Sequence, residues 1–141
     1  MPSPPFHRLS LIVPARSIDA NGHVNNVEYV RWMQDAAISH ADTSGCTAAT
    51  KAIGATWVVR THHVEYLRPA FLNDPILIIT WVATVQKVRS LRKYHLYHAE
   101  TNTLLAKGET EWIFIDGPTG RPRSIPPEVT SCFTLSSAEP G

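Results

Sequence analysis

Residues 16–32 hold the side chains with the clearest capacity for chemistry, in the order Arg-Ser-Ile-Asp-Ala-Asn-Gly-His-Val-Asn-Asn-Val-Glu-Tyr-Val-Arg-Trp. The eight positions 19–26 contain one carboxylate, one imidazole, three carboxamides and a glycine. Asp19 can act as a base or a nucleophile, and His23 as a second titrating group. A helix that starts directly afterwards would offer backbone N–H groups to a developing oxyanion. We therefore interpret this segment as a catalytic site, the alternative being a plain helix cap with a turn.

A long helix is predicted immediately after this loop. The residues from position 27 onwards are mostly apolar, and a helix that is apolar around most of its circumference is typical of one embraced by other elements. Residues 43–45, Thr-Ser-Gly, are expected to end it. The polar residues fall at steps of three or four and form one narrow stripe, which consists of Glu28, Arg31, Asp35, Ser39 and Asp42.

Five strands complete the expected fold. Segments rich in β-branched and aromatic residues occur once before the loop and four times after the helix. The connections between the later strands are too short for crossover helices, which favours antiparallel neighbours or crossings at the sheet ends. The sequence thus predicts an α+β fold in which a five-stranded antiparallel sheet wraps around one long helix. The expected strands are residues 6–13, 57–67, 76–85, 91–99 and 104–115.

The last strand and the segment after it carry two further expectations. Ala106, Gly108, Thr110, Trp112 and Phe114 share one face, with small residues where a close backbone or ligand approach would be needed. The tail, residues 117–141, is rich in Pro and Ser and is expected to be a surface strap or disordered. Residues 1–141 are therefore interpreted as one domain with a core at about 6–116.

Composition narrows the class of protein. The chain has 141 residues, 43% of them hydrophobic, and a formal charge of +1, so neither nucleic acid nor an anionic membrane is indicated as a partner. No secretory leader or membrane-spanning run is recognisable in the chain. Cys46 and Cys132 have no metal-binding spacing and are expected to be reduced thiols in a cytoplasmic protein.

Two segments resemble a known family. Residues 19–29, Asp-Ala-Asn-Gly-His-Val-Asn-Asn-Val-Glu-Tyr, resemble the signature of hotdog-fold thioesterases. The Asp-x-Asn-x-His-x-Asn-Asn pattern is similar to plant acyl-carrier-protein thioesterases and bacterial long-chain acyl-CoA thioesterases, and Asp-x-x-Gly is similar to the 4-hydroxybenzoyl-CoA thioesterase branch. Residues 64–70, which lead to Asp74, resemble a second-strand segment common in the superfamily. The resemblance covers about residues 6–116 and implies a single hotdog domain.

The resemblance implies roles for individual residues. Asp19 would attack the thioester carbonyl or activate a water to do so, and these two roles stay open. Asn21 and His23 would orient the water and transfer a proton. The helix N-terminus would polarise the thioester oxygen through the segment that comprises Gly22, Val24, Asn25 and Asn26, with Asn25 or Asn26 as the helix cap.

The function implied is hydrolysis of acyl-CoA to the free acid and CoA, without a metal or an organic cofactor. An acyl-carrier-protein (acyl-ACP) thioesterase and a non-catalytic acyl-CoA-binding protein are the alternatives. Because the plant enzymes carry two hotdog units and this chain has length for one, a homodimer or a homotetramer is expected. Tyr29, Trp32 and Trp57 could line the acyl slot, although simple core packing is the more frequent role of such residues.

Other groups of polar residues have structural interpretations. His62, His63 and Glu65 are close in sequence, but adjacent residues on a strand point to opposite faces, which favours strand packing over a metal site. The basic residues 89, 92 and 93 are interpreted as a solvated turn rather than a grip on the phosphates of CoA.

Overall fold

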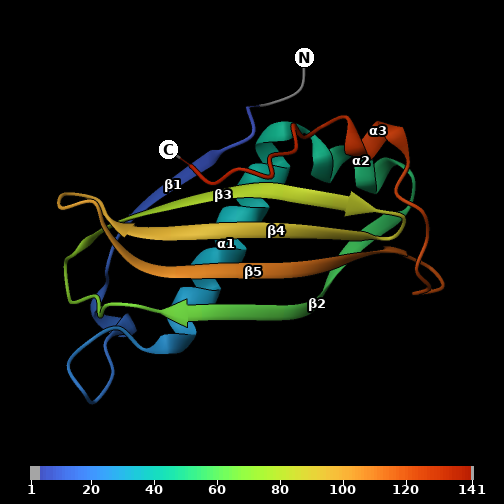
Figure 1. Ribbon diagram of the computed structural model, residues 1–141. Helices are drawn as coiled ribbons and strands as arrows, with labels where there is room; N and C mark the ends of the chain where they lie inside the picture. The colour runs from blue at the N-terminus through green and yellow to red at the C-terminus, as the bar shows by residue number, and fades with distance from the viewer. Residues whose placement is uncertain (1–3, 141) are drawn as a thin grey trace.

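The computed structural model describes residues 4–140, and its elements form one sheet with one long helix behind it (Figure 1). The five strands lie in the order β1-β3-β4-β5-β2, and every neighbouring pair is antiparallel. In chain order the elements are β1 (His7–Ile12), a 3-10 turn (Ala15–Ser17), α1 (Asn26–Ser44), α2 (Cys46–Ala52), β2 (Ala55–Tyr66), β3 (Pro75–Gln86), β4 (Arg89–His98), β5 (Thr103–Asp116) and α3 (Pro127–Thr130).

The predicted α+β arrangement is confirmed, and each predicted strand differs from the observed one by no more than a few residues at either end. The helix ends where expected, because Gly45 adopts the left-handed conformation with φ +86°. The chain then turns directly into α2, which was not predicted. A helix of seven residues completes only two turns, too few for a periodic apolar pattern to be recognised.

A close contact between α1 and the sheet occurs at Gly108. The predicted inner face of β5 is confirmed, and Gly108 lies on it among buried neighbours. A Cβ atom built on Gly108 would lie 2.6 Å from Cε and 2.7 Å from Sδ of Met33, which is itself fully buried. The missing side chain therefore makes room for Met33 and sets how closely the helix packs on the sheet.

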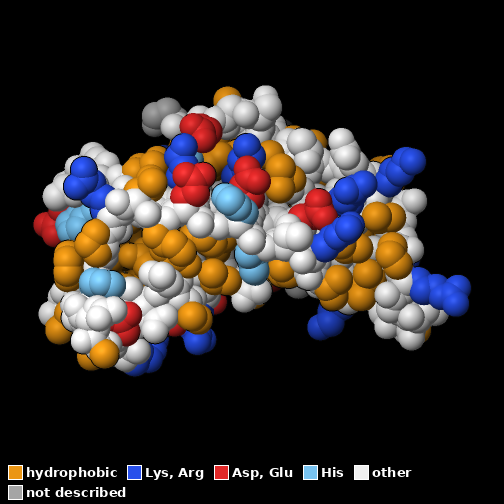
Figure 2. Space-filling view, turned by 60° about the horizontal axis from the view of Figure 1, so that its bottom comes forward, with side chains coloured by type: hydrophobic (Ala, Val, Ile, Leu, Met, Phe, Trp, Pro, Cys, Tyr) orange, Lys and Arg blue, Asp and Glu red, His pale blue; other side chains and the backbone are white. Residues whose placement is uncertain are grey.

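The sheet covers one side of α1, as expected for a helix embraced by other elements, and another side is left exposed in this chain. Val27 is 65% exposed and Ile38 is 55% exposed. On β2, a strand at the edge of the sheet, Val58 and Tyr66 are exposed as well. Figure 2, which turns the lower side of Figure 1 forward, shows hydrophobic side chains gathered in several patches. No helix in residues 4–140 has the length and apolarity needed to cross a bilayer.

Of the two expectations for the tail, the strap is the one observed for residues 117–140. Val129 of α3 is buried, and Phe133 packs in a small apolar cluster with α2 and the start of β2. The backbone N–H of Ser136 donates to the carbonyl oxygen of Val82 on β3 at 3.0 Å. The tail therefore adds a wall to the end of the molecule where α1 finishes (Figure 1).

A buried polar cluster connects α1 with the middle of the sheet. Arg92 on β4 donates through Nη1 to Nδ1 of His40 at 2.9 Å and to Oγ1 of Thr80 at 3.1 Å. His7 stacks on His40 with ring centroids 5.0 Å apart, and its Nε2 lies 2.8 Å from Oγ of Ser39. Burial, followed by the charges of Arg92 and His7, lowers the pKa of His40 to about 3. His40 is therefore neutral in the folded protein.

We predict that filling the space above Gly108 destabilises the fold. Gly108→Val should lower the free energy of unfolding by about 2 kcal/mol, because the new methyl groups overlap Met33. Met33→Ala alone should also destabilise, through a cavity. The double variant should lose less than the sum of the two single changes, as measured by urea unfolding. Additive changes in the free energy of unfolding would contradict a direct contact between Met33 and position 108.

We also predict that acid destabilises the protein through His40. The pKa of His40 is 6.5 in the unfolded chain and about 3 in the folded protein. Between these pH values the unfolded state binds a proton that the folded state does not bind. Neutral His40 therefore makes its full contribution to the free energy of unfolding above pH 6.5, and this contribution is lost progressively as the pH falls towards 3. Its total is on the order of a few kcal/mol. His40→Gln keeps an acceptor for Arg92 and should flatten the dependence of unfolding free energy on pH. The exposed control His63→Gln should keep the wild-type slope; equal slopes for His40→Gln would disprove the assignment.

Candidate active site

A tight loop between the 3-10 turn and α1 presents the predicted catalytic residues. Ile18 and Val24 form an isolated β-bridge that closes the loop. Inside it, the N–H of Asp19 donates to the carbonyl oxygen of His23, and the N–H of Gly22 donates to that of Asp19, both at 3.0 Å. Gly22 has a φ of +82°, a conformation that favours glycine. The loop therefore has a defined shape before any ligand binds.

The Asp19 carboxylate has one oxygen engaged and one available. Its Oδ1 accepts the backbone N–H of Asn21 at 2.8 Å, which fixes the side chain in an Asx turn. Within residues 4–140, Oδ2 has no hydrogen-bond partner. The side chains of Asp19, Asn21 and His23 lie on the same loop but make no hydrogen bonds to one another in this part of the chain. The ring Nδ1 of His23 lies 3.4 Å from the carbonyl oxygen of Val24.

Asn25 is the helix cap, because its Oδ1 accepts the N–H of Val27 at 2.9 Å. The backbone N–H groups of Gly22, Val24 and Asn25 already donate to the carbonyl oxygens of Asp19, Ala70 and Ser17. Among the four residues expected at the oxyanion site, Asn26 alone keeps an N–H without a partner in the described chain. Asn26 is the first helical residue, where intrahelical partners are absent.

A second carboxylate supports the loop from the helix. Oε1 of Glu28 accepts the hydroxyl of buried Ser17 at 2.7 Å, and Oε2 accepts Nε of Arg31 at 2.9 Å. The Ser17 hydrogen bond is the main reason why the pKa of Glu28 is lowered. The sequence places Glu28 on the polar stripe of the helix and within the segment 19–29 that resembles the family signature. The i, i+3 spacing to Arg31 was visible in the sequence, but the partner Ser17 lies eleven positions away in the preceding turn.

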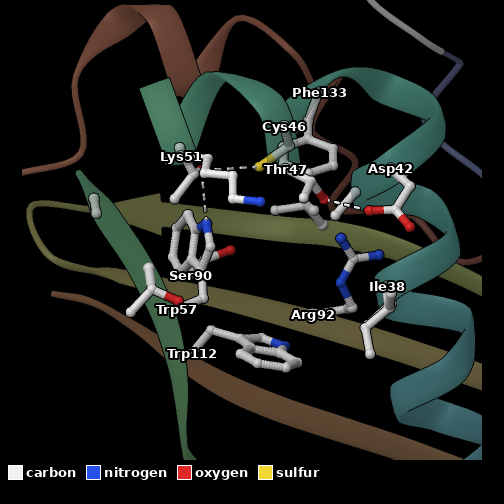
Figure 3. Close-up of a pocket in the computed structure, with 16 residues that line it drawn as sticks. Ile38, Asp42, Cys46, Thr47, Lys51, Trp57, Ser90, Arg92, Trp112 and Phe133 are labelled. Atoms are coloured by element: carbon white, nitrogen blue, oxygen red, sulfur yellow. Dashed lines mark hydrogen bonds between the residues drawn. The ribbon is translucent and has the colours of Figure 1, made fainter. Parts of the chain in front are cut away.

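A pocket of about 410 Å³ lies between the second half of α1, α2 and the inner face of the sheet (Figure 3). Trp57 is part of its wall, whereas Tyr29 and Trp32 are buried in the main core and do not line it. The pocket is mostly apolar, and the buried Arg92 lines it. Figure 3 shows the Arg92 side chain directed into the space between α1 and Trp112; the other lining residues are Ala37, Ile38, Ala41, Asp42, Cys46, Thr47, Thr50, Lys51, Ala55, Thr56, Val82, Ser90 and Phe133.

The location of Arg92 corrects the interpretation of residues 89–93 as a solvated turn. Arg89 and Lys93 are indeed at the surface, where they pair with Glu111 and Glu109 at 3.9 and 3.5 Å. Arg92 points to the opposite face and is 5% exposed. The strand alternation that separates the histidines of β2 also places Arg92 on the face opposite to Arg89 and Lys93.

The pocket and the Asp19 loop lie at different ends of α1. From Asn26, at the start of the helix, to Ile38, at the rim of the pocket, the helix rises about 18 Å. At the other end, the hydroxyl of Tyr66, the last residue of β2, donates to the carbonyl oxygen of Asn26 at 2.8 Å. The first residues of β2, in contrast, line the pocket. The length of β2 thus separates the loop from the pocket within one chain.

The remaining candidate groups have structural partners. His62 lies with Nδ1 2.8 Å from Oγ1 of Thr110, and His63 faces Glu65 on the exposed side of β2, so strand packing separates them as expected. Burial raises the pKa of the Cys46 thiol, which disfavours a thiolate nucleophile. In residues 4–140, no group of three or more His, Cys, Asp and Glu side chains could hold a metal ion.

Comparison with known proteins gives consistent matches. The sequence profile of the thioesterase-like superfamily matches residues 13–133. Acyl-CoA thioester hydrolase YbgC of Escherichia coli is 30% identical over 118 residues, which cover 82% of this chain and 86% of that protein. The L-carnitine dehydrogenase/betainyl-CoA thioesterase of Ruegeria pomeroyi is 26% identical over 140 residues, 97% of this chain, and the chain spans only 28% of that protein.

Solved structures match in fold. Slr0204, a 1,4-dihydroxy-2-naphthoyl-CoA thioesterase from Synechocystis, superimposes with a TM-score of 0.81 over 90% of this chain and 94% of that one, at 16% sequence identity. This likeness confirms the hotdog architecture that the sequence resemblance implied. The profile match covers most of the chain and includes the Asp19 loop, α1 and all strands after it. The chain therefore belongs to the thioesterase-like superfamily and has the hotdog fold of thioester hydrolases.

Proposed function

We propose that this protein hydrolyses acyl-CoA thioesters to the free acid and CoA, with Asp19 as the nucleophile or the general base. The observation that carries the proposal is the Asp19 carboxylate, which is held through Oδ1 while Oδ2 stays unengaged, beside the start of α1. A fixed carboxylate next to a helix N-terminus supplies both a base and a positive dipole end. Family membership and the named acyl-CoA hydrolase relative support the same chemistry.

Different residues of the chain take different roles in the proposed hydrolysis. A thioester needs an attacking oxygen, a donor for the carbonyl oxygen and a dry slot for the acyl group. Oδ2 of Asp19 attacks the carbonyl carbon or removes a proton from water, and Asn21 and His23 orient that water and transfer protons. The N–H of Asn26 is the donor best suited to the developing oxyanion. The thiolate of CoA leaves and takes up a proton to become the free thiol. When Asp19 is the nucleophile, the acyl group is left on Asp19 as an anhydride, which water hydrolyses to give the free acid and restore the carboxylate.

We further propose that the working site lies between two copies of the chain. β2 is an edge strand whose last residue, Tyr66, is bonded to the start of α1 and whose first residues line the pocket. An antiparallel pairing of two β2 edges brings the end of one strand beside the beginning of the other. The Asp19 loop of one copy would then approach the pocket of its partner. The exposed side of α1, with Val27 and Ile38, would be covered in the same dimer.

Asp19→Asn is predicted to abolish turnover without unfolding the loop. Asn retains an oxygen that accepts the N–H of Asn21, so the Asx turn persists, but the attacking carboxylate is lost. We expect kcat for thiol release from acyl-CoA to fall by about a hundredfold or more, with substrate binding retained. The matched control Asp35→Asn changes an exposed carboxylate on α1 and should leave kcat unchanged.

Two results would contradict this assignment. Full activity in Asp19→Asn would exclude Asp19 from the chemistry. Tight acyl-CoA binding without thiol release by the wild type would favour a non-catalytic binder. The same assay with acyl-carrier-protein substrates, repeated at rising salt, tests the acyl-ACP alternative, because recognition of an acidic carrier weakens as salt screens it.

A shared site predicts complementation between two inactive chains. Ala41→Phe fills the pocket while leaving the Asp19 loop intact. In a mixed dimer with Asp19→Asn, one site would combine an intact loop with an intact pocket. Co-expression in equal amounts should therefore restore about a quarter of wild-type activity, since half of the dimers are mixed and each has one working site. No recovery in purified mixed dimers would show that the site lies within one chain.

A further inference from the structure

The guanidinium of Arg92 is a buried charge with only neutral partners. It donates to His40 and Thr80, and its central carbon lies 5.5 Å from the ring centroid of Phe133. The ion pairs formed within residues 4–140 do not include Arg92. Asp42, which lines the same pocket, accepts instead from the hydroxyl of Thr47 at 2.6 Å. Burying a cation without a counter-ion is unfavourable, so an anion supplied from outside would relieve it.

The free donors of Arg92 form a fork. Nη1 has two hydrogens, and His40 and Thr80 accept from this nitrogen. No acceptor for Nε or Nη2 is found in the described chain. These two nitrogens lie on one edge of the planar guanidinium, the edge that pairs with both oxygens of a carboxylate. Figure 3 shows the group directed into the pocket rather than towards the strand on which it is carried.

The walls around this fork suit a short carbon chain. The volume of about 410 Å³ lies within the range of small-molecule sites, which is roughly 300 to 1,000 Å³. Ala37, Ala41 and Val82 supply aliphatic surface, and Trp57 and Trp112 supply aromatic surface. An apolar chain with a carboxylate at its far end matches this arrangement, because methylene groups contact the walls while the carboxylate reaches the cation.

We propose that the acyl pocket selects acyl groups that end in a carboxylate, so that the substrate is the monothioester of a dicarboxylic acid, and that Arg92 binds its terminal carboxylate. This inference rests on the proposed thioesterase function and specifies its substrate class. Arg92 thus binds substrate and takes no part in the bond cleavage, since it lies far from the Asp19 loop of its own chain. The same charge disfavours acyl groups that end in a cation, because like charges repel most strongly in a site shielded from water.

The first test compares length-matched substrates with the wild-type protein. Adipoyl-CoA carries a terminal carboxylate that hexanoyl-CoA lacks, and the same holds for suberoyl-CoA against octanoyl-CoA. We expect kcat/KM to favour the carboxylate-bearing member of each pair by about tenfold or more, mainly through KM. An acyl-CoA that ends in a trimethylammonium group should be the poorest substrate. Equal or reversed preference in both pairs would overturn the proposal while leaving the hydrolase function intact.

The second test removes the fork. Arg92→Met keeps an unbranched apolar side chain and should lower the ratio of kcat/KM for adipoyl-CoA to kcat/KM for hexanoyl-CoA by about tenfold to a hundredfold, because only the first substrate carries a terminal carboxylate. Arg92→Lys keeps the charge but not the fork and should retain part of the preference. Arg89→Met removes a surface arginine from the same strand. It serves as the control and should keep the full preference for adipoyl-CoA. A preference that survives in Arg92→Met would overturn the proposal.

A binding measurement separates the two proposals. Calorimetry in the Asp19→Asn background should show tighter binding of adipoyl-CoA than of hexanoyl-CoA, and Arg92→Met should abolish the difference. If this difference is found but no thioester is cleaved by the wild type, the substrate-class inference stands and the hydrolase function fails. A purely structural role of Arg92 would shift the unfolding midpoint of Arg92→Met and leave the affinity ratio of the two ligands unchanged, which would overturn the inference.

Discussion

The packing of Met33 against Gly108 is the contact on which the arrangement of the whole molecule depends. It lets the end of the Met33 side chain of α1 rest against the backbone of β5, where Gly108 has no side chain of its own. At the start of α1, the carbonyl oxygen of Asn26 accepts the hydroxyl of Tyr66 at the end of β2. The opposite half of the helix is held away from the start of β2, and the pocket occupies the space left between them.

Two polar features of the molecule are stabilised in different ways. The Asp19 loop is stabilised locally, through backbone hydrogen bonds, a glycine at positive φ and the Ser17–Glu28 hydrogen bond. Arg92 instead donates to the neutral groups of His40 and Thr80 and forms no ion pair within residues 4–140. A loop satisfied by its own backbone retains its shape when empty. An unpaired buried cation favours a bound anion, because desolvation has already weakened its contact with water.

The edge strand β2 and the uncovered side of α1 expose surfaces that could pair with another chain. β2 has one side without a neighbouring strand, and exposed apolar residues lie both on it and on the uncovered side of α1. Natural sheets rarely leave such an edge bare, since its N–H and C=O groups invite pairing with another chain. The apolar excess that suggested a helix embraced by other elements is thus consistent with an additional cover supplied by a second copy.

The sequence alone determined the class of fold, the five strands, the span of α1 and the presence of a helix cap at Asn25 or Asn26, because these depend on local periodicity and side-chain chemistry. The structure then identified Asn25 as the cap. The sequence also pointed to the Asp19 loop, where all the polar groups lie within a few positions. Only the tertiary structure decided that Arg92 faces a pocket, that Phe133 of the tail helps to enclose it and that Glu28 bonds to Ser17. These contacts join residues that are far apart in sequence, and their geometry depends on how closely the helix can approach the sheet.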